Sequence, residues 1–289
     1  MHRKQHRHKD RTRQGLDATR QAGERPGLTA GRAIGWHYGV VVTPLRPDWL
    51  TSRPIAHRGL HDLAAGRPEN SLAAFAAAAE AGYPCELDVQ LTHSGALIVL
   101  HDTDLTRVTG VDRPSATQTA GDLPGTRLFG GDQQVPTLAQ VLERVDERIP
   151  LLIELKRGAG ADPRALVRGV LENLGHRGGQ YALCSFDPAL VRSLRAERAG
   201  YPVGQISGRL KGAGPLRRLA GRTMAGNFLT RPDFISYELA GLPSRIVGWW
   251  RGRGVPVLTW TVKSAADERK ARQYADNFIF DGLPAGSGQ

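Results

Sequence analysis

The chain has 289 residues, of which 40% are hydrophobic and 23% charged, ordinary values for a globular protein with a sizeable core. Its two cysteines are too few for a disulfide framework or a cysteine-based zinc site, so we expect buried thiols in a reducing compartment. The net charge of +11 would suit a nucleic acid or an anionic membrane, but residues 1–50 alone contribute +6, from ten Lys/Arg and four Asp/Glu. The excess is therefore concentrated in one terminal segment.

Residues 1–50 are predicted to form a disordered basic N-terminal extension, because they show no hydrophobic periodicity and few large apolar side chains. A nucleic-acid-binding tail and a wrongly assigned start codon are the alternatives. The basic start is not followed by the apolar run of a secretory signal, and no segment reaches the length of a transmembrane helix. We therefore expect a cytoplasmic protein with no membrane span, whose folded domain occupies residues 51–289.

From Pro54 onward, short apolar runs alternate with helical segments. Helices are predicted at 69–82, where Asn70 or Ser71 can cap the start and Gly82 the end, and at 137–145. The stretch 103–136 is rich in Gly, Pro and Thr and is predicted to be an insertion. Nine segments are predicted to be strands: 54–59, 85–92, 96–102, 150–156, 181–187, 202–207, 233–239, 255–262 and 277–282.

Strands that alternate with helices indicate βαβ units and a parallel sheet. The segments 85–92 and 96–102 are the exception, because the few residues between them cannot form the long crossover that parallel neighbours need. These two segments are predicted to pair as an antiparallel hairpin, which leaves eight parallel positions. The sequence therefore predicts a (β/α)8 TIM-type barrel with a small insertion, at about 103–136, after the hairpin.

The predicted hairpin carries two acids and a histidine. With Ser94 and Gly95 as a two-residue loop, Asp88 is predicted to face His101. Because side chains alternate along a strand, one face is predicted to hold Leu87, Val89, Leu91, Ile98 and Leu100, and the other Glu86, Asp88, Gln90, Val99 and His101. Neighbouring carboxylates repel unless a cation lies between them, and a hard divalent cation is the natural candidate. A surface hairpin with a solvated polar face is the alternative.

Two other predicted strands end in chemically useful side chains. One ends in His57-Arg58-Gly59, and the segment 150–156 carries Glu154 and Lys156. Because function in α/β barrels gathers at the carboxyl ends of the strands, we expect these side chains to lie near the hairpin. Three carboxylates can hold a metal, two histidines can act as acid and base, and Arg and Lys can bind phosphate oxygens. The set is chemically complete for hydrolysis of a phosphate ester.

Five spaced motifs follow one another along the chain: His57-Arg58-Gly59, Pro68-Glu69-Asn70-Ser71, Glu86-x-Asp88-Val89, His101-Asp102 and Glu154-x-Lys156. They closely resemble the glycerophosphodiester phosphodiesterase family, from about Pro54 to about Pro284. The resemblance implies a barrel of the phosphatidylinositol-phospholipase type with an insertion after the His-Asp motif, which residues 103–136 fit. The chain departs from the family in its Ser94-Gly95 turn, where Asp-Gly is frequent, and in part of residues 277–282.

The resemblance implies a role for each motif. Glu86, Asp88 and Glu154 would bind one divalent metal, Mg or Ca. His57 and His101 would be the general acid–base pair, and Arg58 and Lys156 would hold the phosphate. Supporting or substrate-side roles would fall to Glu69, Asn70 and Trp260. For the first two a helix start, and for Trp260 a core position, is an equally good interpretation.

The reaction implied by the resemblance is metal-dependent hydrolysis of glycerophosphodiesters to sn-glycerol 3-phosphate and an alcohol. Which histidine acts as acid or base, and whether water or a glycerol hydroxyl attacks first, stay open. A lysophospholipase D-like enzyme acting on lysophospholipids and an inactive barrel that binds nucleic acid are the alternative functions. The expected partner is the small-molecule substrate, with no nucleic acid, and the sequence does not indicate an oligomeric state.

Overall fold

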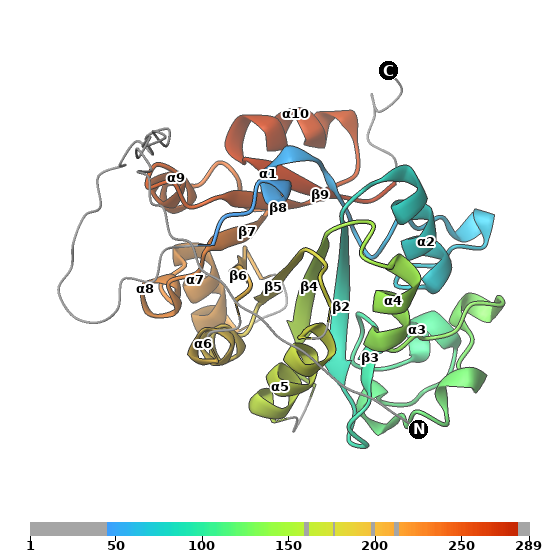
Figure 1. The fold of residues 1–289 in the computed structure, drawn as a ribbon. Helices are drawn as coiled ribbons and strands as arrows, with labels where there is room; N and C mark the ends of the chain where they lie inside the picture. The colour runs from blue at the N-terminus through green and yellow to red at the C-terminus, as the bar shows by residue number, and fades with distance from the viewer. Residues whose placement is uncertain (1–44, 159–161, 176, 198–199, 211–213, 283–289) are drawn as a thin grey trace, which may run out of the picture. The chain divides into compact units, whose positions relative to one another are not determined.

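The computed structural model describes residues 45–158, 162–175, 177–197, 200–210 and 214–282 (Figure 1). Residues 1–44, most of the predicted N-terminal extension, lie outside the described residues. The described part opens with a short helix, α1 (Trp49–Ser52). Its Leu50 carbonyl accepts a hydrogen bond of 2.9 Å from Asn277, the first residue of the last strand, so α1 lies at the amino ends of the strands.

Eight parallel strands close into a barrel, which confirms the predicted fold. The order around the barrel is β1-β9-β8-β7-β6-β5-β4-β2, the β1–β2 pairing closes it, and β3 is antiparallel to β2. The strands are β1 (Ile55–Ala56), β2 (Cys85–Leu91), β3 (Leu97–Val99), β4 (Leu151–Lys156), β5 (Tyr181–Ser185), β6 (Val203–Ser207), β7 (Phe234–Glu238), β8 (Val257–Val262) and β9 (Asn277–Phe280).

Helices surround the barrel (Figure 1). After α1 they are α2 (Leu72–Ala81), α3 (Thr106–Thr109), α4 (Leu138–Val145), α5 (Pro163–Leu174), α6 (Pro188–Ala196), α7 (Pro215–Thr223), α8 (Asn227–Thr230), α9 (Arg245–Arg251) and α10 (Ala265–Tyr274). Within the described residues, every helix is too short or too polar to cross a lipid bilayer. The two helices predicted at 69–82 and 137–145 are present as α2 and α4. Ser71 caps α2, and Gly82 ends it at a φ of 69°.

The alternation of side chains along the strands divides the apolar core into two layers. In β4, Leu151, Ile153 and Leu155 point outward and join the large cluster beneath the helices. Leu152 points into the barrel and joins a second cluster, which Trp49 and Leu50 of α1 extend at the amino end. Glu154 shares the inward face of Leu152, one pleat closer to the carboxyl end. The same alternation that fills the barrel therefore directs an acid into its mouth.

The register of the hairpin differs from the predicted one by a single residue. Val89 pairs with Val99 and Leu91 with Leu97, so Asp88 lies opposite Leu100 and not His101. The loop has three residues between Thr92 and Ala96, whose backbone atoms are joined by a hydrogen bond of 2.9 Å. A three-residue hairpin loop commonly places its last residue in the left-handed region, and Gly95 has a φ of +86°. The predicted two-residue loop was therefore wrong.

The corrected register reassigns the faces of β3. Leu97 and Val99 pack with Leu87 and Val89 in the large cluster. Ile98 and the following Leu100 face the other way, into the apolar centre of the inserted segment. That segment contains α3 and three 3-10 turns, at Ser115–Thr117, Leu123–Gly125 and Leu128–Gly130. Its own small core has these members: Ile98, Leu100, Leu105, Val108, Leu123, Leu128 and Val135.

Candidate active site

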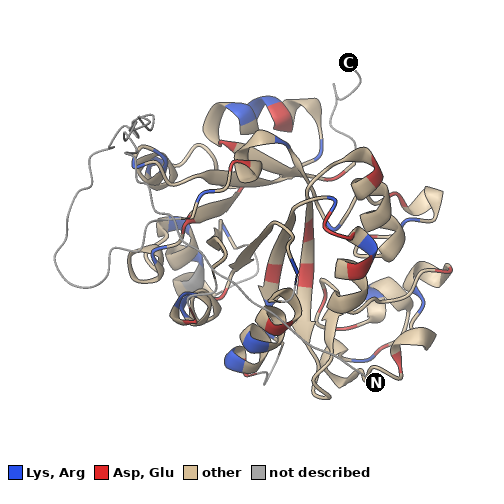
Figure 2. Ribbon diagram, in the orientation of Figure 1, with Lys and Arg blue, Asp and Glu red and all other residues tan. Residues whose placement is uncertain are grey.

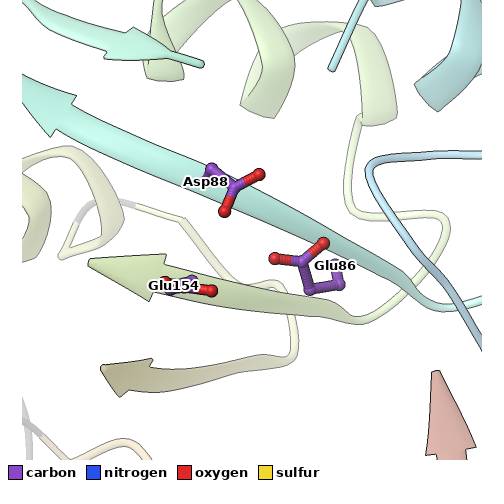
Figure 3. Close-up of side chains that lie close together, drawn as sticks. All are labelled: Glu86, Asp88 and Glu154. Carbon is purple, nitrogen blue, oxygen red and sulfur yellow. The ribbon is translucent and has the colours of Figure 1, made fainter. Parts of the chain in front are cut away.

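Three acids meet at the barrel mouth on two neighbouring strands. In the parallel register of β2 and β4, Asp88 lies beside Glu154. Glu86 is two residues earlier in β2, on the same inward face and closer to the amino end of the strand. All three side chains are buried, and one oxygen of each lies within 4.8 Å of the others (Figure 3). The structure thus brings together the three residues that the sequence analysis proposed as metal ligands.

Two basic side chains partly neutralise this carboxylate cluster. Lys156 Nζ lies 3.3 Å from an oxygen of Asp88 and 3.3 Å from one of Glu154. The Arg58 backbone N–H donates to Glu86 at 3.0 Å, and the Arg58 Nε atom lies 3.3 Å from Asp88. Both residues therefore place positive charge beside the three acids, where it could bind an anionic phosphate.

The acids respond differently to the same environment. Burial raises the pKa of Glu86 and, with help from the nearby Asp88, raises the pKa of Glu154 to about 7. Burial would also raise the pKa of Asp88, but Lys156 and Arg58 outweigh it and lower that pKa to about 2. Burial without a full complement of positive charge disfavours the ionised forms of Glu86 and Glu154. An all-oxygen donor set with this deficit fits a hard divalent cation.

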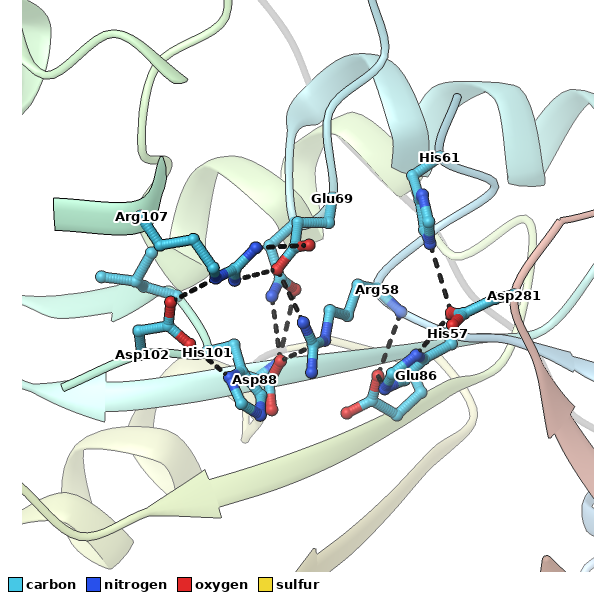
Figure 4. A network of polar contacts seen from close by, with 12 residues as sticks. His57, Arg58, His61, Glu69, Glu86, Asp88, His101, Asp102, Arg107 and Asp281 are labelled. Atoms are coloured by element: carbon cyan, nitrogen blue, oxygen red, sulfur yellow. Dashed lines mark hydrogen bonds and ion pairs between the residues drawn. The ribbon is translucent and has the colours of Figure 1, made fainter. Parts of the chain in front are cut away.

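His57 lies at the carboxyl end of β1 and is held by Asp281, the acid that follows β9. Its Nδ1 atom lies 2.7 Å from Asp281 Oδ1, and its Nε2 atom lies 3.9 Å from Glu86 (Figure 4). Asp281 also contacts His61 at 3.3 Å and Lys263 at 2.7 Å. Burial would raise the pKa of Asp281, but the hydrogen bonds from the two histidines outweigh it and hold that pKa well below its usual range.

His101 follows β3 and lies at the mouth of the barrel after a bend in the chain. It is not among the residues of the hairpin that pair with β2. Its Nδ1 atom lies 2.6 Å from Asp102 Oδ1, and the other oxygen of Asp102 accepts from Arg107 at 2.6 Å. Arg107 also donates twice to Glu69, at 2.7 and 3.1 Å (Figure 4). Burial lowers the pKa of His101, and the charges of Lys156 and Arg58 act in the same direction.

Glu69 and Asn70 contact the residues of the cluster and do not cap α2. Glu69 accepts a hydrogen bond of 2.7 Å from Arg58. The Asn70 backbone N–H donates to the Arg58 carbonyl at 2.9 Å, and its side-chain amide donates to Asp88 at 2.9 Å. The cap is Ser71, whose hydroxyl accepts from the backbone of Ala74. Neither Glu69 nor Asn70 is therefore the cap of α2, and both contact residues of the cluster.

Two hollows meet at the cluster. One, of about 300 Å³, reaches into the barrel and is lined by His57, Glu86, Phe186, Trp260 and Lys263 among others. The ring of Trp260 contacts Phe186 edge to face, with 5.5 Å between the ring centres, so Trp260 forms part of the wall. The other hollow is a wider groove of about 850 Å³ that runs past Asp102, Lys156 and Leu210. His101 and Glu154 line both hollows, so a substrate that spans them would pass the acids at its middle.

Four residues of this network were not predicted from the sequence: His61, Arg107, Lys263 and Asp281. Asp281 had a recognisable signal, because an acid followed by Gly282 directly after a buried strand marks the carboxyl end of a barrel strand. Arg107 had none, because it lies in a stretch without periodicity and meets its partners only through the fold of the insertion. Lys263 directly follows β8, and its position there was the only clue.

A barrel that gathers carboxylates, histidines and basic side chains at the carboxyl ends of its strands has the architecture of a barrel phosphodiesterase. A sequence profile of the glycerophosphoryl diester phosphodiesterase family matches residues 57–282. The match covers most of the chain and includes every strand end described above. The chain therefore belongs to the glycerophosphoryl diester phosphodiesterase family.

Individual relatives agree with this assignment. The chain is 27% identical over 250 residues to the Bacillus subtilis protein YhdW, covering 79% of this chain and 97% of that protein. It is 38% identical over 112 residues, or 36% of its length, to a glycerophosphodiester phosphodiesterase of Caldanaerobacter subterraneus, of which the match covers 45%. The crystal structure of a Thermotoga maritima glycerophosphodiester phosphodiesterase is similar with a TM-score of 0.62 and 27% identity, over 79% of this chain and 94% of that one.

A further solved structure shares the fold at lower identity. It is an Oleispira antarctica phosphodiesterase in complex with the product sn-glycerol-3-phosphate. The TM-score is 0.67 at 21% identity, over 80% of this chain and 94% of that one.

Proposed function

We propose that this protein hydrolyses glycerophosphodiesters to sn-glycerol 3-phosphate and an alcohol, using one divalent metal and two histidines. The observation that carries the proposal is the buried cluster of Glu86, Asp88 and Glu154, whose oxygens lie within 4.8 Å of one another. His57 and His101 line the same hollow as that cluster. Membership of the family, and the product bound to the Oleispira antarctica relative, support the reaction type.

Glu86, Asp88 and Glu154 would hold the metal, for which Mg or Ca is the proposed identity. When bound, the metal would polarise the phosphoryl oxygens and neutralise charge in the transition state. Arg58 and Lys156 would bind the remaining phosphate oxygens and stabilise the charge that develops on them. Both basic side chains are oriented by contacts with the acids at 3.3 Å, which reduces the cost of ordering them when a substrate enters.

The two histidines would move the protons. Each ring has its Nδ1 atom engaged by a carboxylate, His57 by Asp281 and His101 by Asp102. This contact fixes the orientation of the ring and leaves Nε2 as the atom that can take or give a proton. One histidine would remove a proton from the attacking nucleophile, and the other would protonate the leaving alkoxide.

The test is to measure release of sn-glycerol 3-phosphate from glycerophosphocholine and glycerophosphoethanolamine by the purified protein, supplied with Mg or Ca. Lysophosphatidylcholine is offered in parallel, because Phe186, Ile206 and Trp260 give the inner hollow an apolar wall that a lyso-lipid could also use. Turnover of the deacylated substrates supports the proposal. Turnover of lysophosphatidylcholine alone would assign the site to lysophospholipids, and no turnover of any substrate by folded protein would contradict both assignments.

The location proposed for the protein is the cytoplasm. Within the described residues, Cys85 and Cys184 are both buried free thiols, which is the usual state of cysteines in a reducing compartment. The alternative of an inactive barrel that binds nucleic acid has less support, because the described site contains acids, histidines and basic groups in contact with one another.

A further inference from the structure

Helices α7, α8 and α9 expose more large apolar side chains than the rest of the described surface. Five of the nine large apolar side chains that are exposed among the described residues lie on these helices: Leu216 (80% exposed), Leu219 (59%), Phe228 (53%), Leu229 (79%) and Trp249 (38%). We refer to these five as the α7–α9 patch. Isolated exposed leucines are common, but a concentration of this kind marks an interaction surface.

The aromatic part of the patch is continuous between two helices. Phe228 of α8 lies 5.7 Å from Trp249 and 5.3 Å from Trp250 of α9, measured between ring centres. The guanidinium of Arg253 stacks 3.4 Å above the Trp249 ring. The rings therefore form one surface cluster with a basic side chain stacked on it.

The segments that carry the patch are strongly basic. Residues 209–232 contain five arginines and one lysine with no Asp or Glu, and residues 239–256 contain three arginines with no acid. Figure 2 shows basic positions on α7 and α9, and Arg231 directly follows α8. Within the described part of the chain, no carboxylate forms an ion pair with Arg218, Arg222, Arg231, Arg245 or Arg253. An anionic partner would therefore complement this surface.

The patch borders the groove beside the carboxylate cluster. Leu210 lines that groove, and its Cδ1 atom lies 2.6 Å from the place that a Cβ atom on Gly221 of α7 would occupy. The hydroxyl of Ser207, the last residue of β6, donates to the Gly221 carbonyl at 2.7 Å. Helix α7 is thus fixed against the groove wall, so a partner on the patch would lie beside the groove.

We propose that α7, α8 and α9 form a docking surface for an anionic phospholipid membrane. Charge excludes two other occupants, because a second copy of this surface and the basic residues 1–50 carry the same sign. A nucleic acid would bind the arginines and stack on the aromatic rings. It would make no such contact with the aliphatic Leu216 and Leu229, which are the most exposed members of the patch. A lipid interface accepts Leu, Phe and Trp at its apolar edge while Arg reaches the phosphates. This inference does not depend on the proposed function.

The test is flotation of the full-length protein with vesicles of phosphatidylcholine alone and of phosphatidylcholine mixed with phosphatidylglycerol. We expect binding to the anionic vesicles that weakens with salt, and little binding to the neutral ones. One double variant changes the apolar patch itself, Leu216→Ser with Leu229→Ser. A second changes the basic side chains beside it, Arg218→Gln with Arg222→Gln, and both are called patch variants. The arginine pair should lower the partition coefficient on anionic vesicles more than about tenfold, since each surface arginine contributes roughly fivefold. The leucine pair should also lower it more than about tenfold, because it removes apolar side chains that would enter the lipid interface.

Matched controls share the chemistry but lie elsewhere. Arg164 and Arg168 are exposed on α5 with the same spacing as the arginine pair of α7, so Arg164→Gln with Arg168→Gln should bind vesicles as the wild type does. Leu63 and Val111 are 55% and 47% exposed, so Leu63→Ser with Val111→Ser controls for the loss of apolar area. An unchanged midpoint of thermal unfolding, together with unchanged turnover of glycerophosphocholine where the wild type shows it, would establish that every variant is folded.

Three results would overturn the proposal. They are wild-type protein that stays with the unbound fraction, patch variants that bind as tightly as the wild type, and control variants that lose as much binding as the patch variants. Binding of single-stranded DNA in place of vesicles, lost in the patch variants, would also overturn it and would assign the surface to nucleic acid.

Discussion

His57 and His101 each contact a carboxylate through Nδ1, at 2.7 and 2.6 Å, although they come from different strands. Neither acid is in the carboxylate cluster: Asp281 follows β9, and Asp102 is the next residue after His101. Because the contact fixes the ring, the histidines are positioned before a substrate arrives. The proton-transfer role proposed for them therefore has a structural basis that can be tested one residue at a time.

Replacing either histidine should remove turnover without unfolding the protein. We expect His57→Ala and His101→Ala each to lower kcat at least about 100-fold, the usual range for loss of a general acid or base. The matched control is His93→Ala, since His93 is exposed in the hairpin loop. Steady-state kinetics on glycerophosphocholine would measure the effect. A folded His101→Ala enzyme with near-normal kcat would refute the role.

Asp281 should link stability to acid pH. Its pKa is lowered in the folded protein, so its ionised form contributes stability that is fully present above the ordinary pKa near 3.8 and is lost as pH falls toward the folded pKa. The midpoint of thermal unfolding of the wild type should fall as the pH drops below about 4, and Asp281→Asn should reduce that loss of stability by on the order of 1 kcal/mol. Identical pH dependence of the unfolding midpoint in both proteins would show that the contact with His57 contributes nothing to stability.

At the scale of elements, the turn after β1 sets the position of His57 and Arg58 relative to α2. Gly59 has a φ of +83°, and a Cβ atom on it would lie 2.8 Å from the Cβ atom of Ala74. Gly59 therefore permits both the left-handed backbone and the close approach of α2. Asn70, at the start of that helix, then reaches Asp88.

Gly59→Ala should disturb both stability and activity. Gly66 provides the control, because its φ is +70° but nothing lies within 4 Å of the place that its Cβ would take. We expect Gly66→Ala to cost about 1 kcal/mol of unfolding free energy from backbone strain alone. Gly59→Ala should cost about 2 kcal/mol more, from the clash with α2, and should lower kcat/KM. Chemical denaturation of the two variants would measure this difference, and equal costs would show that the approach of α2 is not tight.

The hairpin shows where a sequence pattern is sufficient and where it is not. The short connection required an antiparallel pair, and that pair is present. The register was predicted wrongly because Ile98 and Val99 are both apolar, so either one fits a buried face. The choice depends on the insertion, whose core takes Ile98 and Leu100. The sequence of the hairpin alone contains no information on that packing, and a three-residue loop was as compatible with Gly95 as a two-residue one.

At the scale of the whole molecule, barrel closure produces the site. His57 and Asp281 are 224 residues apart and meet because β1 pairs with β9. The motifs predicted which side chains gather at the mouth, since the carboxyl ends of parallel strands share one edge. They could not predict partners that arrive from outside the strands, such as Arg107, which connects Glu69 to Asp102. Contacts of that kind depend on the folded loops rather than on local pattern.

The metal dependence of turnover is the most direct test of the proposed catalytic site. Protein stripped with EDTA would be assayed for release of sn-glycerol 3-phosphate from glycerophosphocholine while Mg or Ca is titrated back. We expect no turnover without metal and saturable recovery, with Glu154→Gln needing at least about tenfold more metal for half-maximal rate because one of three charged ligands is lost. Stripped protein that retains full turnover, or a Glu154→Gln variant with unchanged metal requirement, would contradict the claim that Glu86, Asp88 and Glu154 hold a metal required for catalysis.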